Sequence, residues 1–334
     1  MAENTKKKLS RGMKALISVG TILVLLASAL LIYYFGHSHK EFNEMSSKEF
    51  AIPGLSDGFV PQGMCFASDA NKYLVSGYMG DSSASRIYVV DNETKKCEKF
   101  FTLTGISEEM QKGHLGGIAN SGNFVWIATE NHILTITLDQ INNVNQGESV
   151  SVLSTLLTPT EASFCYADER TLWVGEFYRD GTYKTDEAHH YQINENEKNY
   201  AIAVSYDINT LNTSGIDEIP TKVLSLPNQV QGFAITNSNK IVLSTSYSIP
   251  DSQILIYKDV LSQEPQAQIV LDSQEFPLYV LDKANLSRTI IAPSMSEGLD
   301  YVDGEVKILF ESACNKYKFV TRNRMYDVMS IALE

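Results

Sequence analysis

Hydrophobic residues along this chain follow two different patterns. Residues 15–35 form one uninterrupted apolar segment that contains no charge. From about residue 53 onward, apolar residues occur instead in short β-branched and aromatic runs, bounded by Gly, Asn, Asp and Ser, as strands and turns require. No 3.6-residue periodicity persists in this second region beyond a turn or two, so the pattern predicts an all-β domain.

The apolar segment predicts a transmembrane helix. Its 21 residues, at ~1.5 Å each, match the ~30 Å hydrocarbon core of a bilayer. Five Lys and Arg residues precede it and only Lys40 follows closely, which predicts a cytoplasmic N-terminus and an outer C-terminal part. The alternative is a signal peptide cleaved at Ala27-Ser28-Ala29, but the apolar run continues for six residues beyond Ala29. We therefore expect a single-pass protein of the cell membrane.

The chain then divides into four parts, of which the outer one is strongly acidic. The expected parts are a cytoplasmic tail (1–14), the helix (15–35), a stalk (36–52) and an ectodomain (53–334). Of the 27 basic and 40 acidic residues, five basic and one acidic lie in the tail, which leaves a net charge of −17 beyond it. Such a surface repels phosphate backbones, so we expect no nucleic-acid partner, and membrane contact through residues 15–35.

Five segments of the ectodomain share one hairpin pattern. Each starts with a polar or small residue and a Gly or Ser, continues with a hydrophobic and a small residue, and passes through a polar turn into a strongly apolar strand. They cover residues 61–78, 114–129, 161–178, 230–247 and 296–313. Further strand pairs lie between these segments, and four-stranded repeating units predict a β-propeller.

The number of blades stays open at five or six. Five hairpins are visible, and residues 277–294 are a candidate for a sixth, degenerate blade. A strand near residues 48–52 is expected to join the C-terminal strand in the last blade and so close the ring. The alternative fold is a β-sandwich, which explains alternating strands but not five copies of one hairpin.

Three features carry a resemblance to known proteins: the hairpins with Gln-Gly, a hydrophobic residue and then Ala or Cys, the stretch HLGGIA from His114, and the stretch LFESACNKY from Leu309. Across residues 53–334 they resemble a group of membrane-anchored, surface or secreted bacterial propeller proteins that has no assigned activity. More remotely, the chain is similar to the six-bladed class of gluconolactonase-like and strictosidine-synthase-like propellers. The resemblance implies the fold alone, because the calcium-binding residues of the lactonases have no match here in their motif context.

Aligned hairpins bring six polar residues to one mouth of the expected central channel. They are Gln62, His114, Glu176, Gln231, Glu297 and Glu311. The carboxylates of Glu176, Glu297 and Glu311 could hold a hard cation such as calcium through oxygen ligands. The whole set could equally hydrogen-bond a sugar or another polar ligand. The structural alternative is that the glutamines satisfy backbone groups of a neighbouring blade and that His114 is a turn residue.

Two further features carry expectations of their own. The acidic insertion at residues 175–200 is expected to be a solvated loop, with a partner-facing lid as the alternative. The four cysteines have no CxxC or metal-ligand spacing. Cys65 and Cys165 replace small core residues, so we expect buried free thiols; the alternative is a disulfide, which the outer compartment permits and whose connectivity the sequence does not give.

Two functions remain after this reading. The first is a tethered module that binds a carbohydrate, peptide or small-molecule ligand or partner. The second is a calcium-assisted hydrolase of a lactone or ester, with its site at the channel mouth. Nucleophile-elbow, HExxH, P-loop and GxGxxG motifs are absent from the sequence, and the residues alone do not decide whether the protein is an enzyme.

Overall fold

The computed structural model describes residues 10–35, 39–105 and 109–333, and the chain forms two compact units, Met1–Lys40 and Glu41–Glu334. In the first unit, α1 (Arg11–Phe35) is a 25-residue helix. Its Arg11–Leu31 part contains an 18-residue stretch with a mean hydropathy of 2.2 and is long and apolar enough to cross a membrane, a criterion that a signal sequence also meets.

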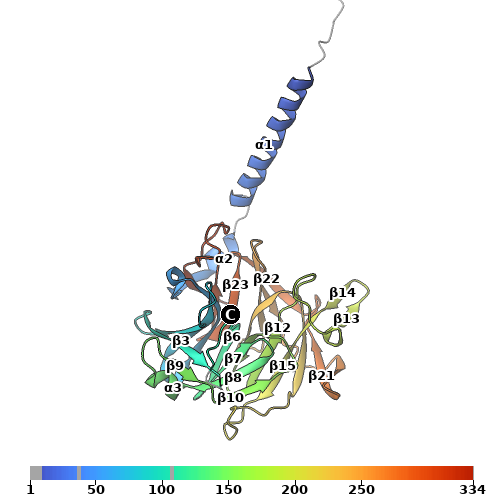
Figure 1. Cartoon of the computed structure of the whole chain (residues 1–334). Coiled ribbons are helices and arrows are strands. Elements are labelled where there is room, and N and C mark those ends of the chain that lie inside the picture. Colours follow the sequence, from blue (N-terminus) through green and yellow to red (C-terminus); the bar gives the residue numbers. More distant parts are fainter. Residues whose placement is uncertain (1–9, 36–38, 106–108, 334) are drawn as a thin grey trace, which may run out of the picture. The chain divides into compact units, whose positions relative to one another are not determined.

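The second unit is a β-propeller of five blades (Figure 1). The innermost strands are β2 (Phe59–Ala67), β6 (Gly117–Ser121), β11 (Ala162–Ala167), β17 (Val230–Ile235) and β23 (Ser296–Val302). Each of them contacts the innermost strands of two neighbouring blades, in the order β2, β6, β11, β17, β23 and back to β2. This closed ring confirms the propeller, fixes the number of blades at five and excludes a sandwich.

Each blade continues outward from its innermost strand by antiparallel pairing. Blade one adds β3 (Lys72–Met79), β4 (Arg86–Asp91) and β5 (Cys97–Thr104), and blade two adds β7 (Phe124–Thr129), β8 (His132–Thr137) and β10 (Ser154–Leu157). Blade three adds β12 (Thr171–Glu176), β15 (Ala201–Asp207) and β16 (Lys222–Leu226), and blade four adds β18 (Ile241–Thr245), β19 (Ser252–Tyr257) and β22 (Leu286–Ala292). Blade five adds β24 (Glu305–Phe310), β25 (Asp327–Ala332) and β1 (Ser46–Ala51).

Extra strands widen two of the blades at their outer edges. β9 (Ser149–Ser151) follows helix α3 (Leu138–Asn143) and pairs in parallel with β5. β21 (Gln274–Val280) pairs in parallel with β16, and β20 (Ala267–Leu271) pairs antiparallel with β21. Residues 277–294, the candidate for a sixth blade, therefore form none, because their two strands, β21 and β22, belong to the edges of blades three and four.

Glycines explain why the hairpin repeat is recognisable in the sequence. A Cβ atom on Gly117 would lie 2.3 Å from the backbone nitrogen of Cys165 in the next blade, and one on Gly232 would lie 2.5 Å from the carbonyl oxygen of Glu297. The innermost strands thus approach one another too closely for any side chain at these positions. The recurring Gly marks the contact between blades around the axis.

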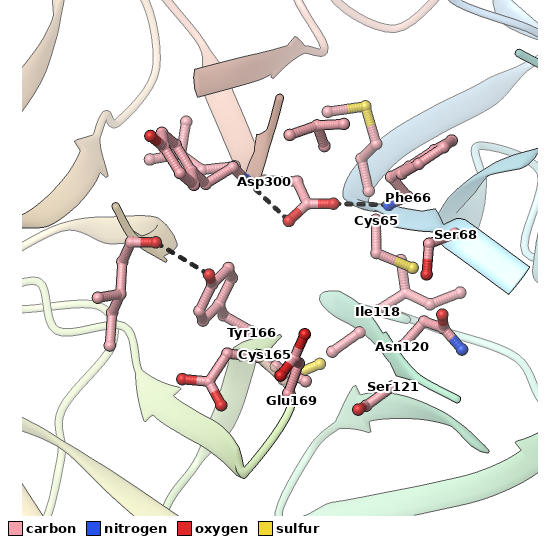
Figure 2. A pocket seen from close by; sticks show the side chains of 18 of the residues that line it. Cys65, Phe66, Ser68, Ile118, Asn120, Ser121, Cys165, Tyr166, Glu169 and Asp300 are labelled. Carbon is pink, nitrogen blue, oxygen red and sulfur yellow. Dashed lines mark hydrogen bonds between the residues drawn. The ribbon is translucent and has the colours of Figure 1, made fainter. Parts of the chain in front are cut away.

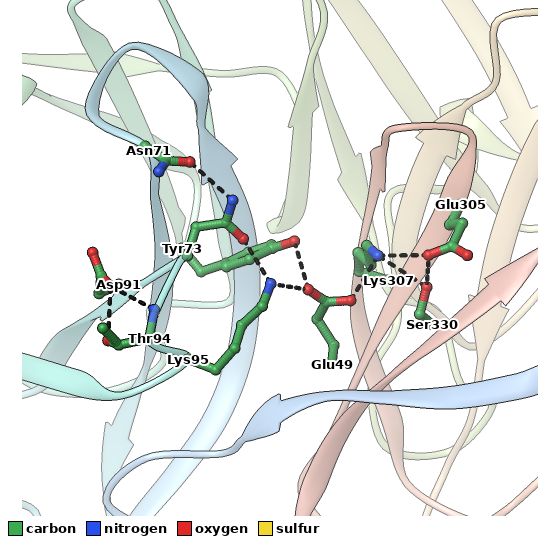
Figure 3. A network of polar contacts seen from close by, with 10 residues as sticks. Glu49, Asn71, Tyr73, Asp91, Thr94, Lys95, Glu305, Lys307 and Ser330 are labelled. Carbon is green, nitrogen blue, oxygen red and sulfur yellow. Dashed lines mark hydrogen bonds and ion pairs between the residues drawn. The ribbon is translucent and has the colours of Figure 1, made fainter.

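Blade five closes the ring with strands from both ends of the unit. β1 pairs with β25, as expected from the sequence. On β1, Glu49 accepts hydrogen bonds from Lys95 of blade one and from Lys307 of blade five, the latter at 2.7 Å (Figure 3). The ring is therefore closed by backbone pairing and by a carboxylate held between two ammonium groups.

Residues 36–38 of the expected stalk (36–52) lie outside the described residues, and from Glu41 onward the segment belongs to the second unit. Helix α2 (Lys40–Met45) and β1 lie within or at the border of the second unit. Phe42 and Phe50 are buried there, and the Phe50 ring packs 4.8 Å from that of Tyr73. Two buried aromatic residues in an otherwise polar segment are enough to fix it to the blades.

The cysteines are free thiols: Cys65, Cys165 and Cys314 are buried and Cys97 is exposed. Burial raises the pKa of the Cys165 thiol to about 12, so this thiol stays protonated at neutral pH.

Candidate functional site

The candidate site is a cavity of about 700 Å³ at the end of the channel where the innermost strands begin. Backbone irregularities in four of these strands shape its floor. The pairing register shifts at Gln62, Ser163, Gln231 and the Glu297–Gly298 step, each in the first half of an innermost strand. A β-bulge re-aims the side chain that it inserts. All four of these bulged strands contribute a side chain to the cavity lining: Gln62, Ser163, Gln231 and Glu297.

Five of the six residues expected at the mouth line this cavity: Gln62, His114, Gln231, Glu297 and Glu311. Hydrogen bonds connect them across the axis. Gln231 Nε2 donates to Glu297 Oε1 at 3.4 Å, and the Glu297 carboxyl donates to Glu311. From the other side, His114 Nδ1 donates to Gln62 Oε1 at 3.2 Å, and Gln62 Nε2 donates to Glu311 Oε2 at 3.1 Å.

Both halves of this chain of hydrogen bonds therefore donate toward Glu311. Gln62 also donates to the carbonyl oxygen of Pro61 at 2.8 Å, so its amide serves its own strand as well as the cavity. The structural role expected for this glutamine and its place in the cavity are thus both present. Glu311 accepts hydrogen bonds from two side chains, Gln62 and Glu297, and is the acceptor at which the network converges.

Burial keeps the two carboxyl groups largely neutral. It raises the pKa of Glu297 well above the ordinary 4.5, and the neighbouring carboxyl group of Glu311 raises it further. Burial also raises the pKa of Glu311 to about 8, although Lys316 and the hydrogen bonds from Gln62 and Glu297 oppose it. The pKa of His114 is lowered by burial and by Lys316. The floor of the cavity is therefore rich in hydrogen-bonding groups and carries little charge at neutral pH.

Aromatic side chains form the walls around this polar floor. The rings of Tyr78 and His114 stack with centroids 4.1 Å apart, and Lys316 Nζ donates to the Tyr78 hydroxyl at 2.6 Å. Across the cavity, Phe177 packs against Tyr183 and Tyr247. Sequence reasoning did not select these residues, although aromatic pairs or single rings recur at the end of three hairpin segments: Tyr78, Phe177-Tyr178 and Tyr247.

Glu176, the sixth expected residue, lies elsewhere. It lines a smaller cavity of about 270 Å³ beside the entrance cavity. Its carboxylate accepts from His189 Nδ1 at 2.7 Å and from the backbone nitrogen of Ile202 at 3.1 Å. The acidic insertion folds back onto the end of β12 through the short helix η3 (Glu187–His189) and withdraws Glu176 from the channel mouth. The same insertion supplies Thr182, Tyr183 and Lys184 to the wall of the entrance cavity.

The expected calcium ligands are consequently not assembled. Within the part of the chain that the structure describes, no group of three or more His, Cys, Asp and Glu side chains is placed to hold a metal ion. Glu297 and Glu311 remain adjacent, but Glu176 is paired with His189 in the neighbouring cavity. Hard cations need more oxygen ligands than one carboxyl pair supplies.

A second cavity, of about 890 Å³, occupies the opposite end of the channel (Figure 2). Its most deeply buried carboxylate is Asp300, which accepts from the backbone nitrogens of Phe66 at 2.6 Å and Tyr301 at 2.8 Å. Burial raises the pKa of Asp300 to about 7, while these two hydrogen bonds and Lys307 act against the rise. Asp300 thus serves the backbone of two adjacent blades.

The fold and the channel define the class of this protein as a five-bladed β-propeller with a polar entrance cavity. Solved structures similar to it include the glutaminyl cyclase of Myxococcus xanthus, at 10% identity and a TM-score of 0.43, covering 86% of this chain and 97% of that one. Another is the PQQ-bound aldose sugar dehydrogenase of Streptomyces coelicolor, at 13% identity and a TM-score of 0.37, covering 79% and 76%.

At these TM-scores the similarities carry no information about function, and the propeller assignment rests on the strand pairing of the chain itself. No protein-family model matches the sequence. No curated protein matches it either.

Proposed function

We propose that this protein is a membrane-tethered, extracytoplasmic binding module whose entrance cavity takes a hydroxyl-rich ligand of the carbohydrate class. The tether is α1, with its basic N-terminal flank in the cytoplasm and the propeller outside. The supporting observation for the ligand is the convergence of the hydrogen-bond chain on Glu311 from both sides.

A ligand at this site has to match groups that both donate and accept hydrogen bonds but carry little charge. The amides of Gln62 and Gln231 offer both kinds of group, and Glu311 offers acceptor oxygens beside the protonated Glu297. Sugar hydroxyls donate and accept in the same way, and the apolar face of a sugar ring packs on aromatic side chains such as Tyr247. A volume of about 700 Å³ suits a ligand of this size.

The test uses the full chain in lipid nanodiscs, because maltoside detergents are themselves sugars. Binding to an array of immobilised mono- and oligosaccharides is measured for the wild type, for Glu311→Gln and for a control, Glu169→Gln, at the opposite cavity. We expect at least one sugar to bind, and Glu311→Gln to weaken it about tenfold, which is about 1.4 kcal/mol. Sugar binding that is absent, or equally strong in Glu311→Gln, would contradict the proposal.

A second candidate function is metal-free acid–base hydrolysis of an ester or lactone. It is favoured by one observation: Glu297 and Glu311 form a hydrogen-bonded carboxyl pair. Such a pair can provide a general acid, and also a general base once Glu311 has lost its proton at a pH near or above its pKa of about 8. Turnover of p-nitrophenyl acetate and of γ-butyrolactone, abolished in Glu297→Gln but retained in Glu169→Gln, would support hydrolysis instead of simple binding.

A further inference from the structure

The connection between β24 and β25, residues 312–326, is the most basic part of the ectodomain. It contains Lys316, Lys318, Arg322 and Arg324 and no acidic residue. The remainder of residues 36–334 has 18 basic and 39 acidic residues, a net charge of −21. A positive segment on so negative a domain is attracted to anionic surfaces that the rest of the domain repels.

Exposed apolar side chains accompany these charges. Phe319 is 80% exposed, and Val320 and Tyr326 are each 53% exposed. In the described part of the propeller, Phe319 is the most exposed aromatic residue. Phe and Tyr beside Lys and Arg are the combination that enters the headgroup region of a bilayer.

The base of this segment is fixed, so its exposed tip has a defined position. Thr321 Oγ1 donates to the carbonyl oxygen of Ser312 at 2.7 Å, and Arg322 forms an ion pair with Asp251 of the neighbouring blade. Asn315 Nδ2 donates to the carbonyl oxygen of Ser56 at 2.9 Å. Little conformational entropy is therefore lost when the tip binds a surface.

The segment also starts beside the place where the chain enters the propeller. The ring of Phe42 in α2 contacts that of Phe310 edge-on, with centroids 6.0 Å apart, and Phe310 ends β24. At the other end, the backbone nitrogen of Ile52 donates to Tyr326. In Figure 1 the dark red connection lies next to α2. In the sequence, four residues separate the end of α1 at Phe35 from the start of α2 at Lys40.

We infer that the tip of segment 312–326 is a membrane-contact surface that places Phe319 in the headgroup region of an anionic phospholipid bilayer. The inference goes beyond ligand binding and depends on α1 acting as an anchor. Each Lys or Arg near an anionic surface adds to the attraction, and the tip carries several of them. Because Lys316 and Tyr317 of this segment contact or line the entrance cavity, bilayer contact would fix one wall of that cavity.

The experiment places a fluorescent reporter at the tip. The two native tryptophans, Trp126 and Trp173, are buried, so Phe319→Trp introduces an exposed reporter. The full-length variant is reconstituted in phosphatidylcholine vesicles with brominated acyl chains, with and without phosphatidylglycerol. The control is Leu211→Trp, since Leu211 is 93% exposed and lies between β15 and β16 of blade three.

We expect brominated lipid to quench the tryptophan at position 319 above the level of the control, and more strongly when phosphatidylglycerol is present. Adding Lys318→Glu and Arg324→Glu should return the quenching to the control level. Equal quenching at positions 319 and 211 in both bilayers would overturn the inference and leave a protein partner as the occupant of this surface. Neither result depends on a sugar ligand, so this test is independent of the proposed function.

Discussion

The two ends of strand β23 carry buried carboxyl groups that are satisfied in opposite ways. Glu297, at the entrance cavity, is bound by other side chains: it donates to Glu311 and accepts from Gln231. Asp300, three residues further along at the opposite cavity, accepts from the backbone nitrogens of Phe66 and Tyr301. Both groups are less than a tenth exposed, so burial alone does not distinguish them.

The difference indicates which end of the channel is built for a ligand. Asp300 fills hydrogen-bonding needs of the backbone, which any residue sequence in these strands would create. The pair of Glu297 and Glu311 has no such obligation, and apolar residues at these positions would remove the cost of burying two acids next to each other. The fold does not need this carboxyl pair, so the entrance cavity is the end of the channel that we infer to bind a ligand.

The largest expected effect concerns the pH dependence of the two acids at the entrance. Because burial raises their pKa values, to about 8 for Glu311, the folded state holds protons that an unfolded glutamate, with a pKa of 4.5, has already lost. The unfolded state then binds fewer protons, and the free energy of unfolding decreases as pH rises from about 5 to about 9, by roughly 3 to 5 kcal/mol.

Glu297→Gln removes one of the two charges that would repel each other at high pH. We therefore expect this variant to equal the wild type near pH 5 and to exceed it in stability near pH 9, measured by urea unfolding with tryptophan fluorescence. Glu169→Gln, an exposed carboxylate at the opposite end, should follow the wild-type curve. Parallel curves for Glu297→Gln and the wild type would show that the pair is not strained by burial.

The propeller fold could be predicted from the sequence because the contacts between neighbouring blades require similar residues at regular intervals. Positions such as Gly117 and Gly232 recur, since neighbouring blades approach there too closely for a side chain. The blade count could not be read in the same way. β21 and β22 follow each other in the sequence with the spacing of a blade, yet β21 joins the edge of blade three by parallel pairing and β22 joins blade four.

The sequence predicts the site residues whose position follows from the register of the hairpins, but not those whose position depends on the fold of a loop. Gln62, Gln231 and Glu297 occupy equivalent bulges, so an alignment of hairpins finds them together. Glu176 and Glu311 also occupy one register, but Glu176 is bound by His189 from the insertion that follows it. The spacing of the hairpins does not predict where that insertion folds.

The second effect tests the structural carboxylate. Asp300→Ala leaves the buried backbone nitrogen of Phe66 without its acceptor, and we expect a loss of about 3 kcal/mol in the free energy of unfolding. Asp300→Asn, which keeps one acceptor oxygen, should lose less, and Asp69→Ala, at an exposed aspartate of the same cavity, should change little. If Asp300→Ala were as stable as Asp69→Ala, the contrast between the two ends of β23 would lose its basis.

The smallest effect concerns Glu49, a partly buried carboxylate that is held by opposite charges. Burial opposes its ionisation, but the hydrogen bonds and charges of Lys307 and Lys95 outweigh it and lower the pKa of Glu49. Its contribution is therefore present at neutral pH and lost as pH falls through the folded-state pKa, the reverse of the behaviour at Glu297.

We expect Glu49→Gln to cost about 1 to 2 kcal/mol at neutral pH, because Lys307 is left buried with Glu305 as its remaining carboxylate partner. The control is Lys48→Ala on the same strand, whose ion pair with Asp327 has a 75% exposed lysine and is worth at most about 0.5 kcal/mol. Urea unfolding at neutral and acidic pH separates the cases: a Glu49→Gln loss that persists unchanged in acid would mean that shape, and not charge, closes the ring at β1.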